Sequence, residues 1–76
     1  MEMKTKLRGT VKAVKPEMGY MFVTDAATGE DYFAHKTAIE RTSPVTWDDV
    51  QQGQSVEFTP ITGPKGLRAI EVRVAA

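Results

Sequence analysis

The chain has 76 residues, enough for one domain spanning residues 1–76, and ten basic and ten acidic side chains give it a formal net charge of zero at pH 7. It contains no cysteine, which excludes a disulfide framework and a thiolate metal site and suits a reducing cytoplasm. The first eight residues contain no uninterrupted apolar run, so we expect neither a secretory signal nor contact with a membrane.

The first predicted strand covers residues 3–11. Its odd positions are mostly apolar or small and its even positions are polar, the period of two that marks a strand buried on one face. The outer face carries a basic strip, Lys4, Lys6 and Arg8, and then Lys12. We interpret the strip as a means of keeping an edge strand soluble; the alternative is that it extends the path of the nucleic acid.

Two aromatic strands follow. Residues 15–19 contain a proline and a glycine, which end strands and form turns, and residues 20–24 are a β-branched and aromatic run. Residues 25–29 predict a turn into a third strand at 30–35, which pairs with the second as a hairpin.

The rest of the chain predicts two more strands and one short turn. The segment 36–54 is too long and polar for a simple connection. Within it, Thr46 as a capping residue and Asp49 three positions later predict a helical turn over residues 47–52 that Gly53 ends. Residues 55–61 and 67–74 predict strands joined by a loop rich in glycine and proline.

Five short strands without a long helix predict an all-β fold. Closure of the sheet would remove its edges, as in a five-stranded antiparallel barrel of the OB-fold type or in an SH3-like barrel. The number of strands does not distinguish the two.

The second and third strands have two apolar faces, and only one of them can fill the barrel. One face carries four rings, Tyr20, Phe22, Phe33 and His35. The other carries Met21 and the residues that alternate with the rings. Two interpretations follow: the rings form the core with Met21 outside, or the rings lie outside, where they can stack unpaired bases.

The order and spacing of five segments resemble the bacterial cold-shock domain. They cover nearly the whole chain and lie at residues 9–12 (Gly-Thr-Val-Lys), 19–23 (Gly-Tyr-Met-Phe-Val), 31–35 (Asp-Tyr-Phe-Ala-His), 53–58 (Gly-Gln-Ser-Val-Glu-Phe) and 63–72. In that family the two central strands carry ribonucleoprotein motifs similar to residues 18–23 and 32–36. The resemblance implies that the four rings face outward and stack the bases of single-stranded nucleic acid.

The resemblance also assigns Trp47, which aligns with a loop aromatic that the family uses for stacking. The alternative is that Trp47 and Val50 plug the open end of the barrel. Other stacking positions are missing, because the family usually has a Trp-Phe pair at Ala13 and Val14 and an aromatic residue at Lys36. At ~1–3 kcal/mol for each base stack, this predicts a shortened site and weaker binding.

Four cations are expected around the rings. Lys12 is expected to contact a phosphate, and Lys36 to replace stacking with a charge contact. Lys65 and Arg68 flank the last hairpin, where family members often contact the strand. For each cation alone, a solvated surface position is the alternative.

Catalysis finds little support in the sequence. There is one histidine, no cysteine, no glycine-rich phosphate loop and no histidine pair for a metal. We therefore predict no enzyme activity, no catalytic residue, no metal, no cofactor and no small-molecule substrate.

The predicted function is sequence-tolerant binding of single-stranded RNA or DNA by a monomer or weak homodimer, as an RNA chaperone or a regulator of transcription or translation. A protein-interaction or self-association barrel that uses the same aromatic face is the alternative. Net charge does not exclude nucleic acid, because segments 1–20 and 61–76 carry +3 and +2 and would form a basic face if they lie close together.

Overall fold

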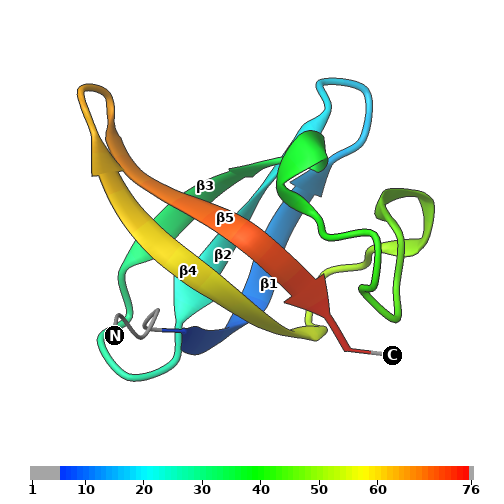
Figure 1. The fold of residues 1–76 in the computed structure, drawn as a ribbon, viewed down its shortest axis with the longest axis horizontal. Coiled ribbons are helices and arrows are strands. Elements are labelled where there is room, and N and C mark those ends of the chain that lie inside the picture. The colour runs from blue at the N-terminus through cyan, green and yellow to red at the C-terminus, as the bar shows by residue number, and fades with distance from the viewer. Residues whose placement is uncertain (1–5, 76) are drawn as a thin grey trace.

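In the computed structural model the chain forms a closed five-stranded barrel (Figure 1), and residues 6–75 are described. The strands are β1 (Leu7–Lys15), β2 (Tyr20–Asp25), β3 (Asp31–His35), β4 (Ser55–Gly63) and β5 (Gly66–Val74). Their order is β1-β2-β3-β5-β4, and β4 closes the barrel against β1. Neighbouring strands are antiparallel except β3 and β5, which are parallel where Phe33 pairs with Arg68. The predicted all-β barrel is confirmed.

Strand β1 departs from its predicted range. Residues 3–5 of the prediction lie outside the described residues, and the strand continues to Lys15. A β-bulge at Lys12 explains the extension, because the pairing with β2 shifts between Val11 and Ala13. The extra residue resets the alternation of the strand. As a result Ala13 pairs with Phe22 on the outer face, and Val14 packs against the core.

The register of β2 and β3 decides which face fills the barrel. Met21 pairs with Ala34, and both side chains are 0% exposed. Tyr32 is also buried, and its ring centroid lies 5.0 Å from that of Phe58 on β4. The interpretation that places the four rings in the core and Met21 outside is therefore wrong.

The segment between β3 and β4 contains two short 3₁₀ helices, η1 (Lys36–Ala38) and η2 (Trp47–Asp49). Thr46 is the N-cap of η2, but its side chain makes no capping hydrogen bond. The helix ends at Asp49, with Val50 as its C-cap, instead of continuing to Gln52, so the predicted side-chain capping and the predicted end of this turn are wrong. No helix within residues 6–75 is long and apolar enough to cross a membrane.

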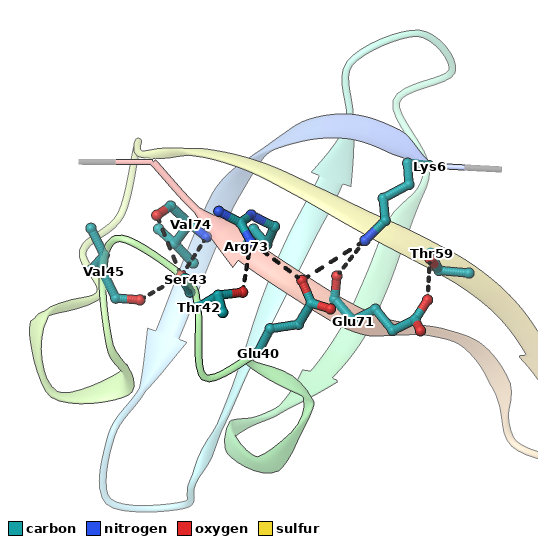
Figure 2. A network of polar contacts seen from close by, with 9 residues as sticks. All are labelled: Lys6, Glu40, Thr42, Ser43, Val45, Thr59, Glu71, Arg73 and Val74. Atoms are coloured by element: carbon teal, nitrogen blue, oxygen red, sulfur yellow. Dashed lines mark hydrogen bonds and ion pairs between the residues drawn. The ribbon is translucent and has the colours of Figure 1, made fainter. Parts of the chain in front are cut away.

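A polar network holds this segment on β5 (Figure 2). The buried Ser43 hydroxyl donates to the Val45 carbonyl at 2.7 Å and accepts from the Val74 N–H at 2.9 Å. Nearby, Arg73 Nη1 donates to Thr42 Oγ1 at 2.7 Å. Because these bonds join the segment to one strand of the barrel, they fix the connection that leaves β3 at His35.

Candidate nucleic-acid interface

Three aromatic rings form a packed, half-buried cluster on the outer face of β2 and β3. The ring centroids are 5.6 Å apart for Tyr20 and Phe22, 5.1 Å for Tyr20 and Phe33, and 6.0 Å for Phe22 and Phe33. Cross-strand pairing sets this arrangement, since Phe22 lies opposite Phe33 and Tyr20 lies opposite His35. We call these four residues the aromatic face. The predicted outward orientation is confirmed, and the three rings pack against one another.

A groove of about 490 Å³ lies beside the aromatic face. We call it the first groove; its lining residues are Phe22, Asp31, Phe33, His35, Lys65, Leu67 and Arg68. One wall comes from the β4–β5 hairpin, so the structure brings Lys65 and Arg68 to the rings. The Arg68 guanidinium carbon lies 5.6 Å from the Phe33 ring centroid, within the range of a cation–π contact.

Lys12 reaches the first groove through Asp31. Its Nζ lies 2.6 Å from Asp31 Oδ2, while Thr24 Oγ1 donates to Asp31 Oδ1 at 2.8 Å. The hydrogen bond from Lys12, and then that from Thr24, lowers the pKa of the Asp31 carboxyl. The Lys12 ammonium thus lies beside a carboxylate that lines the first groove, and it already has an anionic partner. A phosphate contact by Lys12 stays a prediction.

The positions where family members usually carry further aromatics lie in different surroundings. Ala13 lies on the outer face opposite Phe22, so a larger side chain there would widen the aromatic face. Val14 packs against the core and adds nothing to that face. Lys36 is exposed, and its aliphatic stem lies close to Gly19, where an added Cβ would be 3.5 Å from Lys36 Cδ. The predicted shortening of the site therefore concerns the Ala13 and Lys36 positions.

Trp47 does not line the first groove. Its ring is half-buried and packs against the core, and Val50 belongs to that core with 8% exposure. This packing agrees with the alternative in which both residues close one end of the barrel. Stacking by Trp47 stays a prediction.

Leu67 and Thr37 lie at the site, but the sequence pattern does not indicate either of them. Leu67 lines the first groove, but the pattern predicts only that it begins a strand. Thr37 contacts His35 because His35 caps η1, a 3₁₀ helix that the sequence pattern does not predict. The one signal in the sequence is Thr37, a short polar residue two positions after His35, at the point where the predicted strand ends. Within residues 6–75, no group of three or more His, Asp or Glu side chains could hold a metal ion.

Known proteins resemble this chain over almost its whole length. Residues 7–75 match the model of the 'Cold-shock' DNA-binding domain family. Cold shock-like protein CspA of Stigmatella aurantiaca is 45% identical over 65 residues, which cover 86% of this chain and 91% of the relative. Y-box-binding protein 1 of Xenopus laevis is 41% identical over 69 residues, which cover 90% of this chain but 23% of that protein. The solved structure of Drosophila Unr CSD456 superposes with a TM-score of 0.73 at 25% identity, covering 96% of this chain and 28% of that one.

Proposed function

Because this chain belongs to the cold-shock DNA-binding domain family, we propose that it binds single-stranded RNA or DNA by stacking unpaired bases on its aromatic face. The observation that carries the proposal is the cluster of Tyr20, Phe22 and Phe33, packed within 6.0 Å and partly exposed. Beside it, the cations Lys65 and Arg68 line the first groove.

The mechanism is stacking combined with charge contacts to the backbone of the strand. Each base that stacks on an aromatic ring contributes ~1–3 kcal/mol, and every base has a π-face, so the binding tolerates many sequences. We expect a preference for pyrimidine-rich segments. A strand whose bases lie on the protein is kept unpaired, which suits an RNA chaperone or a regulator of transcription or translation in the cytoplasm. This mechanism needs no nucleotide hydrolysis.

Replacement of single rings tests the proposal. Phe22→Ala and Phe33→Ala should each weaken binding by ~1–3 kcal/mol, or about fivefold to 150-fold in Kd, because each removes one stacking surface. Fluorescence anisotropy with a labelled oligothymidine of about seven nucleotides measures the change. Phe22→Tyr is the matched control, since it keeps a ring at the same place.

Folding of the variants is checked separately. Both rings lie on the outer face, so we expect far-UV circular dichroism to match that of the parent. If both alanine variants fold and bind as tightly as the parent, stacking on the aromatic face is excluded.

A further inference from the structure

His35 has two local roles in the structure. It ends β3 on the aromatic face, and it is the N-cap of η1 with φ −76° and ψ 152°. Its Nδ1 accepts a hydrogen bond from the Thr37 backbone N–H at 3.2 Å and lies 2.9 Å from Thr37 Oγ1. This is the bond that a serine or aspartate cap usually makes, here made by an imidazole.

The capping bond determines the tautomer of the ring. A backbone N–H can only donate, so Nδ1 must be the acceptor. In a neutral imidazole one nitrogen accepts and the other carries the proton, so the proton of His35 is on Nε2. Within residues 6–75 no side chain or carbonyl accepts a hydrogen bond from Nε2.

The ring stands where two grooves meet. Besides the first groove, a second groove of about 390 Å³ lies between η1 and β5, and His35 and Arg68 line both. Thr37 and Ile39 are part of the lining of the second groove. A strand that leaves the aromatic face past His35 therefore has open space on both sides of the ring.

The direction of the Nε2–H bond limits what it can contact. An imidazole donates in the plane of its ring, whereas a base stacked on the ring lies parallel to that plane. Nε2–H therefore cannot donate a hydrogen bond to the base stacked on His35 itself, and its acceptor must belong to a neighbouring nucleotide. The candidate acceptors are a phosphate oxygen and a base carbonyl oxygen.

We propose that Thr37 is a positioning residue which holds His35 as the Nε2–H tautomer, so that His35 stacks one base and donates a hydrogen bond to an oxygen of the neighbouring nucleotide. This inference rests on the proposed function, because it assigns a second contact to a residue of the same site. It changes what is expected of His35: a ring without a donor cannot replace it.

The first test is the ring itself in the unmodified protein. Long-range ¹H–¹⁵N spectra of the free protein should show the Nε2–H tautomer. The Nε2–H resonance should shift and exchange more slowly when oligothymidine is added. An Nδ1–H tautomer in the free protein, or an Nε2–H signal that stays unchanged at saturation, would overturn the inference while leaving base stacking intact.

The second test separates the donor from the stacking face. His35→Phe keeps an aromatic ring, so stacking alone predicts binding as tight as that of the parent. Loss of the donor predicts binding about three- to tenfold weaker. Equal affinity of the two proteins would overturn the inference.

Comparison of oligothymidine with oligodeoxyadenosine identifies the acceptor, since adenine has no carbonyl oxygen. A loss with thymidine only assigns a base carbonyl, and an equal loss with both assigns an oxygen of the sugar–phosphate backbone.

The third test asks whether Thr37 acts through His35. Thr37→Ala keeps the backbone N–H but removes the Oγ1 contact at 2.9 Å to Nδ1 that orients the ring, so it should weaken binding about two- to threefold in the parent and leave the His35→Phe protein unchanged. Thr37→Ser keeps both contacts and should behave as the parent. An equal loss in both backgrounds would show a merely structural effect and overturn this role of Thr37. If the parent binds neither oligonucleotide, the proposed function is wrong, while the tautomer is still measured in the free protein.

Discussion

The contact between Lys12 and Asp31 sets the charge at one edge of the aromatic face. Lys12, at the β-bulge of β1, reaches across β2 to Asp31 on β3, and the two side chains meet at 2.6 Å although both are substantially exposed, at 58% and 40%. An exposed pair of this kind adds little to stability. Its importance is local, because a phosphate that approaches Lys12 must compete with a carboxylate already in place.

Acid titration of Asp31 tests this contact. Its pKa is lowered from 3.8, so the carboxylate favours the folded protein above the pKa of the unfolded chain, and this contribution is lost as the pH falls through the lower, folded value. Lys12→Met should raise the pKa of Asp31 towards 3.8, and Thr24→Val should raise it less, since the Lys12 bond is the larger cause. Carboxyl ¹³C shifts between about pH 6 and pH 2 measure both. An Asp31 pKa that is the same in the parent and in Lys12→Met would mean that Lys12 is free for phosphate.

At the scale of elements, regular alternation could be predicted from the sequence and local exceptions could not. The pattern of β2 and β3 predicted their pairing and, with the family resemblance, which face points outward. In β1 the pattern ends at Val11, because the bulge at Lys12 inserts a residue that no composition signal marks. Likewise, the imidazole of His35 caps η1, although histidine is not a usual capping residue. Thr46 is a usual capping residue and occupies the N-cap of η2, but its side chain makes no capping hydrogen bond.

The close approach of β1 to β2 makes Gly9 a sensitive position. A Cβ added to Gly9 would lie 2.0 Å from the Thr24 carbonyl oxygen, a backbone atom that cannot turn away. We expect Gly9→Ala to destabilise the barrel by at least ~1–3 kcal/mol, because the two strands must separate. Urea unfolding measures the change, with Gly63→Ala as the control. An added Cβ at Gly63 meets only ordinary contacts of 3.8 Å, so that variant should unfold near the parent midpoint. A parent-like midpoint for Gly9→Ala would contradict the close approach.

At the scale of the whole molecule, ion pairs are distributed unevenly among the cations of residues 6–75. Away from the first groove, Arg8 lies 3.3 Å from Glu57, and Lys6 and Arg73 each lie 3.9 Å from Glu40. Near the groove, no carboxylate within residues 6–75 lies in ion-pair distance of the cations Lys36, Lys65 and Arg68. Lys15 and Arg41 also have no ion pair within residues 6–75, so unpaired cations are not confined to the groove. A chain with zero net charge still places the unpaired Lys65 and Arg68 in the groove lining, which the total charge does not reveal.

The salt dependence of binding follows from this distribution and distinguishes nucleic acid from a protein partner. If Lys36, Lys65 and Arg68 each neutralise one phosphate while Lys12 stays with Asp31, log affinity should fall against log salt with a slope of about −2, since each phosphate on a single strand contributes about −0.7. The double variant Lys65→Gln/Arg68→Gln should reduce the slope to about −0.7, whereas Arg8→Gln, outside the groove and paired with Glu57, should leave it unchanged. Oligothymidine titrations at several salt concentrations measure the slopes. A flat line for the parent would mean that these cations do not contact phosphates, which would contradict the proposed charge contacts to nucleic acid. A protein partner held by apolar contact with the same rings would itself bind with little response to salt.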